Sequence, residues 1–140
     1  MDIPQSLRDL LDTGPLGHMV TLDPDGTPRV TLSWAGFDGD ELVLATFPDQ
    51  RKLDNIRRDP RVVVSFLSPD EAPGGGLHPY AVISGRGRVV EGGALEWMDQ
   101  LAEHYIGPGQ KFWWRDAPPG FKIHLEIDRI YGIGPWARSS

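Results

Sequence analysis

The chain has 140 residues, with 20 acidic and 14 basic side chains and a formal net charge of -6. This length predicts one domain that buries a core without metal, and the negative charge disfavours a general nucleic-acid surface. Cys is absent, which excludes disulfides and thiolate catalysis and is typical of a cytoplasmic protein. No apolar run approaches the roughly 20 residues of a membrane span, and the first residues lack a signal-peptide pattern.

Short apolar segments separated by turns make up most of the chain, which contains 17 Gly and 13 Pro. Runs of β-branched residues predict strands, and apolar residues at helical spacing predict three helices. The glycines of SGRGR, residues 84–88, predict a bulge or bend. In chain order we predict a helix from about Ile3 to before Gly14, strands 18–22, 28–37 and 42–47, a helix over 50–58, strands 61–67 and 80–91, a helix over 95–105 and a strand over 121–131.

This order predicts a mainly β fold with helices, as a single domain over residues 1–140. Parallel winding would need repeated crossover helices, which the order lacks. Six antiparallel strands in a closed or nearly closed barrel would remove the exposed strand edges. We therefore predict a six-stranded antiparallel barrel.

The common catalytic motifs are missing. The sequence contains no GxGxxG after a strand and no GxxxxGK[ST], HExxH or GxSxG. The four histidines are scattered without ligand spacing, so we predict no metal site. Chemistry beyond the reach of side chains would then require a bound organic cofactor.

The helix over 50–58 carries the clearest candidate binding feature. Arg51 and Lys52 lie in its first turn, where a phosphate would meet side-chain donors and free backbone N–H groups. Asn55 lies one turn further and shares a face with Arg51. A cationic cluster on an acidic protein indicates an anion site. The alternative is a solvated helix whose charge is balanced by Asp54 and Asp59.

Aromatic residues near strand ends and in loops give a second indication of binding. Trp34, Tyr80, Trp113, Trp114 and Trp136 all occupy such positions, where aromatic side chains often serve as binding or interface residues. The alternative is that each packs over the barrel core, and for Trp34 we favour it. For Trp136, in the terminal GIGPW segment, we expect docking against another surface, such as a second subunit.

Four segments together resemble a known family: HMVTLDPDGTPRVTLSW, LATFPDQRKLDNIRRDPRVVVSF, YAVISGRGRVV and IDRIYGIGPW. They occur in the family's order and span nearly the whole chain, and RKLDNIRRDPRV is the most specific piece. The chain resembles the split β-barrel flavin-binding proteins related to pyridoxamine 5'-phosphate oxidase. Within these proteins it most resembles the actinobacterial oxidoreductases that use the deazaflavin coenzyme F420. The resemblance implies a homodimer with two cofactor sites at the subunit interface.

The resemblance also implies which residues hold the cofactor. The isoalloxazine-like ring would lie along two strands, at Val30, Thr31, Leu32, Ser33, Leu44, Ala45 and Thr46. The phosphate-bearing tail would meet Gln50, Arg51, Lys52 and Asn55. The second subunit would contribute His78, Tyr80, Pro135 and Trp136.

One departure from the family's sequence motifs helps to choose between the two possible cofactors, F420 and FMN. In pyridoxamine phosphate oxidase, an Arg and a Lys a few residues later reach the FMN phosphate. Here Arg29 matches the Arg, whereas the Lys position falls near Ser33 or Trp34. The C-terminal Arg and His motif for the substrate phosphate is also absent. The resemblance therefore favours F420 over FMN, and a substrate other than pyridoxamine phosphate.

The reaction implied is hydride transfer between F420 and an electron-poor small molecule such as an enone, quinone or tetrapyrrole. Tyr80, His78 or water would supply the proton. The loops over 69–79 and 111–120 are the expected substrate walls, since loops vary while the barrel stays rigid. In the second loop, three aromatic side chains would either suit a flat acceptor or pack over the barrel end; these are Phe112, Trp113 and Trp114.

Other classes of function remain open at this point. One is an FMN-dependent enzyme like pyridoxamine phosphate oxidase. Another is a non-catalytic protein that carries F420 or a flavin, or that binds haem. A haem protein would need an axial ligand, for which His18, His78 and His124 are the candidates.

Overall fold

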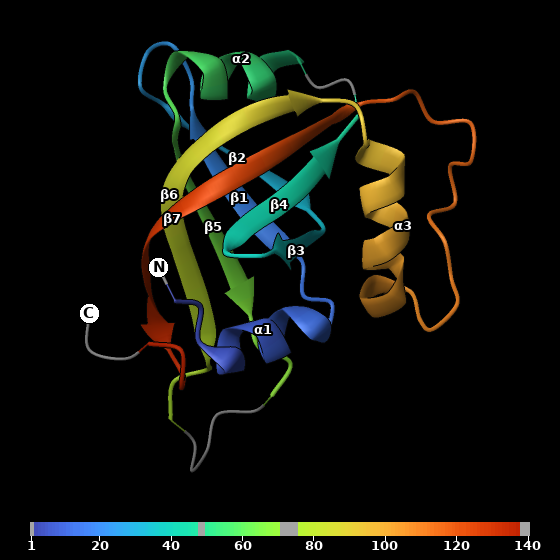
Figure 1. Cartoon of the computed structure of the whole chain (residues 1–140). Coiled ribbons are helices and arrows are strands. Elements are labelled where there is room, and N and C mark those ends of the chain that lie inside the picture. The colour runs from blue at the N-terminus through green and yellow to red at the C-terminus, as the bar shows by residue number, and fades with distance from the viewer. Residues whose placement is uncertain (1, 48–49, 71–75, 138–140) are drawn as a thin grey trace.

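The computed structural model describes residues 2–47, 50–70 and 76–137 (Figure 1). It confirms a mainly β fold with three helices. In chain order the elements are α1 (Gln5–Asp12), β1 (Gly17–Leu22), β2 (Pro28–Ser33), β3 (Ala35–Asp38), β4 (Glu41–Thr46), α2 (Gln50–Arg58), β5 (Arg61–Leu67), β6 (Tyr80–Glu91), α3 (Ala94–Tyr105) and β7 (Phe121–Ile133).

The described strands form one antiparallel sheet in the order β2-β1-β5-β6-β7-β4-β3. The predicted strand 28–37 is divided at Trp34, so that β2 pairs with β1 at one edge and β3 pairs with β4 at the other. The sheet therefore has seven strands and is open, and the prediction of six strands in a closed or nearly closed barrel is wrong. The chain bends at Trp34 because its indole stacks on Tyr105, with ring centroids 4.9 Å apart.

The main core lies inside the curve of this sheet. Alternate residues of the strands point inward, as the pleat of a strand requires; Met19, Leu44 and Phe66 are among those that are fully buried. Two helices cover the ends of the curved sheet (Figure 1). Helix α1 contributes Leu7, Leu10 and Leu11, and α2 contributes Leu53 and Ile56.

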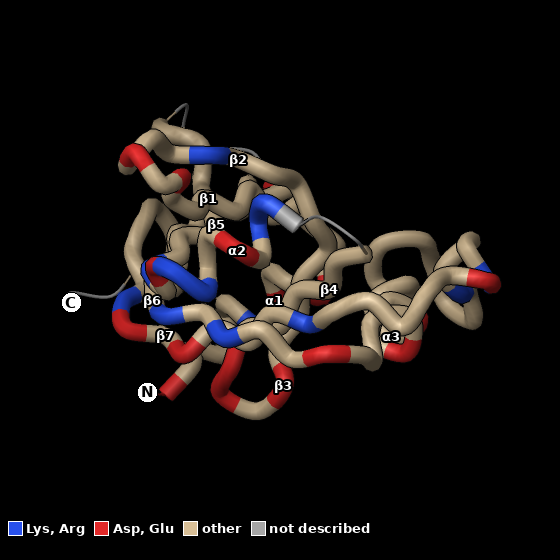
Figure 2. The backbone as a smooth tube through the Cα atoms, turned by 90° about the horizontal axis from the view of Figure 1, so that it is seen from above, with Lys and Arg blue, Asp and Glu red and all other residues tan. Residues whose placement is uncertain are grey.

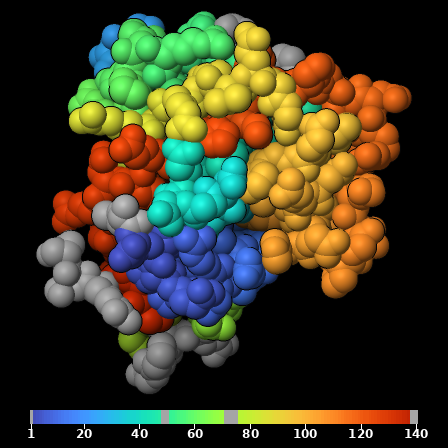
Figure 3. Space-filling model, in the orientation of Figure 1, coloured from blue at the N-terminus to red at the C-terminus, as the bar shows by residue number. Residues whose placement is uncertain are grey.

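A second, smaller core lies between α3 and the outer side of β4. It contains Ala45 of β4, residues of α3 and Phe112 from the loop that follows α3. The indole Nε1 of Trp97 donates a hydrogen bond to the carbonyl of Val43, at 3.0 Å, and fixes α3 to the strand. Figure 3 shows α3 packed beside the β3–β4 segment, with α1 below it. Because the two cores lie on opposite sides of β4, the strand is buried on both faces.

The predicted irregularity in the SGRGR segment is confirmed as a register shift between Ser84 and Gly85, where β6 pairs with β7. A Cβ atom at Gly85 would lie 2.0 Å from the carbonyl oxygen of Glu126. Only glycine lets the two backbones approach so closely. The bulge lets the long strands β6 and β7 curve together around the core.

The other side of β2, β1, β5, β6 and β7 forms an uncovered surface, which we call the outer apolar face. Its strand registers place outward residues in continuous rows, with Leu32 opposite His18 and Val82 opposite Tyr131. In the described part of the chain, no helix packs on this face (Figure 1). None of the helices described is long and apolar enough to span a membrane. Its large exposed side chains are Val30, Leu32, Leu67, Tyr80 and Tyr131.

Candidate functional site

A groove lies where the free edge of β2 approaches β4, and we call it the seam groove. Its volume is about 330 Å³. No backbone ladder joins these two strands among the described residues, so the edge of β2 keeps backbone groups that a ligand can use. The lining residues come from six parts of the chain: Leu16, Leu32, Ser33, Trp34, Ala45, Thr46, Phe47, Lys52, Met98, Phe112 and Trp113.

The seam groove brings together five of the predicted cofactor-binding residues. They are Leu32 and Ser33 at the end of β2, Ala45 and Thr46 at the end of β4, and Lys52 in the first turn of α2. The hydroxyl groups of Ser33 and Thr46 donate to the carbonyl oxygens of their next residues, at 3.0 and 2.8 Å. Their oxygen lone pairs can therefore still accept hydrogen bonds.

Lys52 is the basic residue of the groove lining. The Lys52 side chain is only 6% exposed, which is uncommon for lysine. It lies in the first helical turn, whose N–H groups add a positive potential. A buried cation beside apolar and aromatic walls suits the anionic part of a ligand whose other part is a flat ring.

The remaining residues of the predicted anion cluster face a different hollow. Arg51 and Asn55 line an open hollow of about 820 Å³ with Arg58 and with acidic residues of α2 and the β1–β2 turn. Lys52 points elsewhere because successive helical residues are rotated by about 100°. Figure 2 shows basic and acidic positions alternating along α2. Gln50 begins α2, and its side chain is outside the described part of the structure.

Asn55 is 1% exposed, and internal hydrogen bonds surround it. Its Nδ2 donates to Thr21 Oγ1 at 3.2 Å and to Asp23 Oδ1 at 2.9 Å, and its Oδ1 accepts from Arg58 at 3.0 Å. Arg29 donates to both carboxylate oxygens of Asp23, at 2.9 and 3.2 Å. The hydrogen bonds from Arg29, followed by that from Asn55, hold the pKa of Asp23 below its usual value. This network fixes α2 on the β1–β2 hairpin.

The other two predicted residues of β2 lie outside the groove lining. Val30 points to the outer apolar face and is 59% exposed. Thr31 points the opposite way, because side chains alternate along a strand. Its hydroxyl oxygen is buried and is the one buried side-chain polar atom in the described residues without a hydrogen-bond partner. Such an atom usually indicates a water or a ligand group that is not present.

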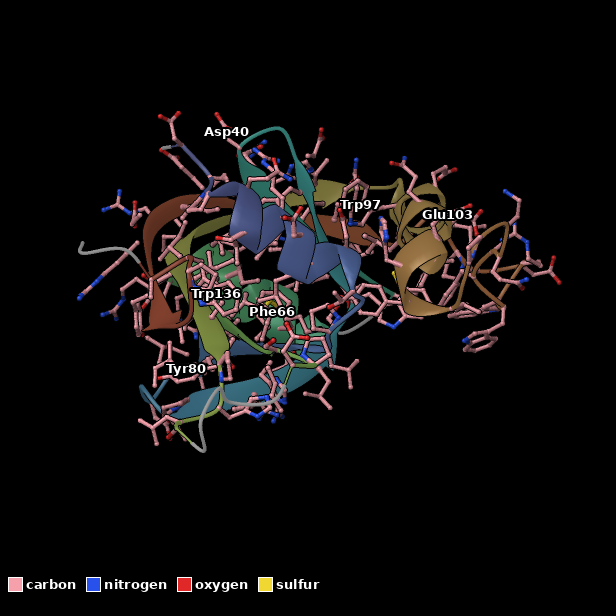
Figure 4. All side chains as sticks on the ribbon, turned by 90° about the horizontal axis from the view of Figure 1, so that it is seen from below. Asp40, Phe66, Tyr80, Trp97, Glu103 and Trp136 are labelled. Carbon is pink, nitrogen blue, oxygen red and sulfur yellow. The ribbon has the colours of Figure 1, made fainter. Side chains whose placement is uncertain are left out.

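The predicted residues near the start of β6 and the C-terminus lie apart from the groove of the same chain. Trp136 is buried in the main core, and its Nε1 donates to the carbonyl of Tyr80 at 2.8 Å. The indole thus docks on its own chain, whereas the sequence suggested another subunit. Pro135 lines a small hollow beside α1, and a ring nitrogen of His78 lies 2.7 Å from the carbonyl of Ser68. Figure 4 shows Trp136 and Tyr80 together and well away from α3.

Sequence reasoning missed several lining residues and left others undecided. Leu16, Phe47 and Met98 were not predicted to line the groove. Phe112 is buried and packs edge-on against Trp34 at 5.6 Å, while Trp113 lines the groove and is 74% exposed. The predicted loop over 69–79 lies partly outside the described residues.

The histidines are dispersed in the structure as well. His124 is buried, with Nδ1 3.3 Å from Glu41 Oε1, and His18 is exposed on β1. In the described part of the chain, no group of three or more His, Asp or Glu residues could hold a metal ion.

A strongly curved antiparallel sheet that stays open, with the edge of β2 next to β4 but not paired with it, is the arrangement of a split β-barrel. The family model described as pyridoxamine 5'-phosphate oxidase matches residues 3–134. The chain therefore belongs to the pyridoxamine 5'-phosphate oxidase family. Among curated proteins, none matches this chain at a significant level.

Solved structures share this fold. An F420 reductase aligns with a TM-score of 0.71 at 25% sequence identity, over 92% of this chain and 98% of the other. A conserved hypothetical protein from Mycobacterium tuberculosis aligns with a TM-score of 0.73 at 21% identity, over 94% of this chain and 84% of the other. HupZ from group A Streptococcus aligns with a TM-score of 0.68 at 17% identity, over 99% and 100% of the two chains. The last two similarities concern the fold alone.

Proposed function

We propose that this protein is an oxidoreductase that binds coenzyme F420 in the seam groove and transfers a hydride between it and an electron-poor small molecule. The observation that carries the proposal is the meeting of Lys52 with Leu32, Ser33, Ala45 and Thr46 in one groove. These residues come from three different elements, β2, β4 and α2. Family membership and the similarity to an F420 reductase support the same conclusion.

The donors and acceptors around the groove suit such a cofactor. Lys52 offers a cation to a phosphate or carboxylate. The free edge of β2 offers backbone groups to the polar edge of a ring, and the apolar residues of the lining offer contact area to its faces. The unpartnered hydroxyl of Thr31, next to Leu32, is a further polar group that a ligand or a water would satisfy.

The absence of one lysine of the family's FMN motif favours F420 over FMN. The family's FMN motif would require a Lys near Ser33 or Trp34, and both of these residues line the groove. Their side chains cannot supply the second cation for an FMN phosphate. Arg29, which matches the other phosphate-binding residue of the motif, makes a two-point ion pair with Asp23. FMN remains the alternative cofactor that the binding experiment below tests.

When bound, F420 supplies or accepts the hydride at its ring. The protein's own residues then have three tasks. Lys52 holds the anionic part of the cofactor, and the β2 edge orients the ring. The apolar lining keeps water away from the reacting atoms. A proton must reach the reduced acceptor, and we propose Tyr80, His78 or a water as its source, with the two side chains provided by a second subunit.

We propose a homodimer formed through the outer apolar face. Monomeric proteins rarely leave several large apolar side chains together in solvent, and this face exposes Val30, Leu32, Leu67, Tyr80 and Tyr131. Leu32 belongs to both the outer apolar face and the seam groove. A subunit that docks on this face would therefore border the groove. Tyr80 lies on the same face, so a two-fold interface can bring it to the groove of the other subunit.

The first test is a titration of the purified protein with F420 and, separately, with FMN, followed by cofactor fluorescence. We expect micromolar or tighter binding of F420 and weak binding of FMN. Tight binding of FMN would assign the protein to the flavin-dependent part of the family. Binding of neither would overturn the proposal. Reduction of an enone or quinone by reduced F420 then separates an enzyme from a non-catalytic carrier, and a Soret band after addition of haem would indicate a haem protein.

The role of Lys52 is tested by Lys52→Met, which removes the charge and keeps most of the buried aliphatic chain. We expect F420 affinity to fall by roughly 1.5–3 kcal/mol, as for a charged hydrogen bond. Arg57→Met is the matched control, because Arg57 lies on the same helix, is exposed and does not line the groove. An unchanged dissociation constant for Lys52→Met would remove Lys52 from the site.

A further inference from the structure

The loop that follows α3 carries three consecutive aromatic residues with different environments. Phe112 is 7% exposed and stacks on Phe47, with ring centroids 5.6 Å apart. Trp113 is 74% exposed and lines the seam groove. Its ring lies 5.2 Å from that of Phe112 and 6.2 Å from that of Trp114, to which it is nearly parallel. The exposed indole is therefore backed by other aromatic rings.

A polar clamp holds this part of the loop on α3. The Asp99 carboxylate accepts a hydrogen bond from the backbone N–H of Phe112 at 2.9 Å and from Arg115 Nη1 at 2.7 Å. The same Arg115 nitrogen donates to the carbonyl of Phe112 at 3.1 Å. Both backbone polar groups of Phe112 are thus bound. The hydrogen bond from Arg115 lowers the pKa of Asp99, so the carboxylate stays charged near neutral pH.

The clamp anchors a loop that is rich in Gly and Pro. Residues 107–120 contain three glycines and three prolines and lie outside helices and strands. Without an anchor, the aromatic side chains of such a loop would lose their fixed positions. With Phe112 buried and clamped, the neighbouring Trp113 is presented at the groove at a small entropy cost on binding. An exposed indole held in this way is a ready contact surface for another ring.

We propose that Trp113 is the stacking surface for a planar, uncharged conjugated ring of the acceptor, and that Asp99 and Arg115 are positioning residues for it. That the ring belongs to the hydride acceptor rests on the proposed function, whereas the assignment of Trp113 as a stacking surface does not. The lining of this groove also includes apolar Leu16, Leu32 and Met98, which favour an uncharged ring. Its basic residue, Lys52, is assigned to the anionic part of the cofactor. Its volume of about 330 Å³ is near the lower end of the roughly 300–1,000 Å³ typical of small-molecule sites. We therefore infer a compact ring system.

The test is calorimetric titration of the full-length protein, without cofactor, with 1,4-naphthoquinone as the probe. Calorimetry does not depend on the fluorescence of Trp113. Loss of an aromatic pair is expected to raise the dissociation constant about two- to tenfold in Trp113→Ala, and Trp113→Phe should recover most of the affinity. Ile106→Ala is the control, since Ile106 is exposed at the end of α3 and does not line the groove.

The clamp is tested by Asp99→Ala, which should raise the dissociation constant for the probe while circular dichroism shows an intact fold. Asp99→Asn keeps one acceptor for the Phe112 N–H and should have the smaller effect. If the wild-type protein and Trp113→Ala bind the probe equally, or neither binds it, or Ile106→Ala loses as much affinity, the proposal is wrong.

The proposed function and the proposed role of Trp113 can be disproved independently of each other. Loss of F420 binding by the wild-type protein would overturn the proposed function but leave a Trp113-dependent affinity for naphthoquinone. If F420 does bind, Trp113→Ala should weaken its binding less than Lys52→Met does. The KM for a planar acceptor should then rise with little change in kcat, because a stacking contact contributes to ground state and transition state alike. A fall in kcat with an unchanged KM would contradict this role.

Discussion

At the scale of single residues, Lys52 and Asn55 show why neighbouring positions of one helix serve different purposes. Lys52 is buried and lines the seam groove. Asn55, less than one turn away, is equally buried but bonds Thr21 and Asp23 of the β1–β2 hairpin. The two side chains are about 60° apart around the helix axis, so they lie side by side on α2, one toward the groove and the other toward the hairpin. Lys and Asn side chains can each bind a ligand or stabilise the fold. Only the location of the groove shows that Lys52 can contact a ligand, whereas Asn55 makes structural hydrogen bonds.

Tyr105 provides a pH-dependent test at this scale. Its hydroxyl donates to the carbonyl of Pro15 at 2.5 Å and accepts from the N–H of Ala35 at 3.1 Å. Burial raises the pKa of Tyr105 from 10.0 to about 12, because the phenolate is poorly solvated inside the protein. The unfolded chain ionises at the lower pH. This contribution to stability is therefore present below pH 10 and is lost as pH rises towards 12.

We expect Tyr105→Phe to lower the free energy of unfolding by about 1–3 kcal/mol near neutral pH, because the N–H of Ala35 loses its acceptor. Urea unfolding from pH 8 to 11 should show the difference between the wild-type protein and this variant shrinking as pH rises. Other tyrosines titrate alike in both proteins and cancel in the comparison. A difference that is constant or grows with pH would show that Tyr105 ionises as readily in the folded state as in the unfolded state.

At the scale of elements, the accuracy of the sequence predictions followed the range of the interactions involved. The helix over 50–58 and the strands over 61–67 and 80–91 were predicted with correct bounds, because local periodicity and turn residues determine them. The division of strand 28–37 was missed, because it depends on the stacking of Trp34 on Tyr105, 71 positions away in the chain. The same limit applies to the site. Residue type indicated an anion site on α2, but only the groove that β2 and β4 form beside α2 selects Lys52.

The bulge in β6 gives a prediction at this scale. Gly85→Ala places a Cβ atom against the backbone of Glu126, and a backbone cannot move aside as a flexible side chain can. We expect the free energy of unfolding to fall by about 1–3 kcal/mol or more, with increased amide exchange along β6 and β7. Ser84→Ala, at the neighbouring half-buried position, should change stability by less than about 0.5 kcal/mol. Equal effects of the two substitutions would contradict the close approach at Gly85.

At the scale of the whole molecule, the arrangement of the helices explains where a partner can bind. Helices α1 and α2 cover the ends of the curved sheet, and α3 covers β4 (Figure 1). The outer apolar face therefore stays open across β2, β1, β5, β6 and β7. A face of this kind is self-complementary when two copies meet across a two-fold axis. The net charge of -6 opposes association only weakly at physiological salt, since charges more than about 8 Å apart are screened.

The double variant Leu67→Glu and Tyr131→Glu tests this interface. Leu67 and Tyr131 are 58% and 39% exposed in the single chain, so the folded monomer tolerates polar side chains there, whereas a dimer would bury four additional carboxylates without partners. We expect sedimentation velocity to show a dimer for the wild-type protein and a monomer for the double variant. Ile106→Glu, at an exposed position just after α3 and away from the face, should remain dimeric. If the second subunit completes the cofactor site, the monomeric variant also loses F420 affinity, although neither substitution lies in the seam groove. A monomeric variant that binds F420 as tightly as the wild-type protein would show that one chain holds the cofactor alone. A wild-type protein that is monomeric would rule out the interface.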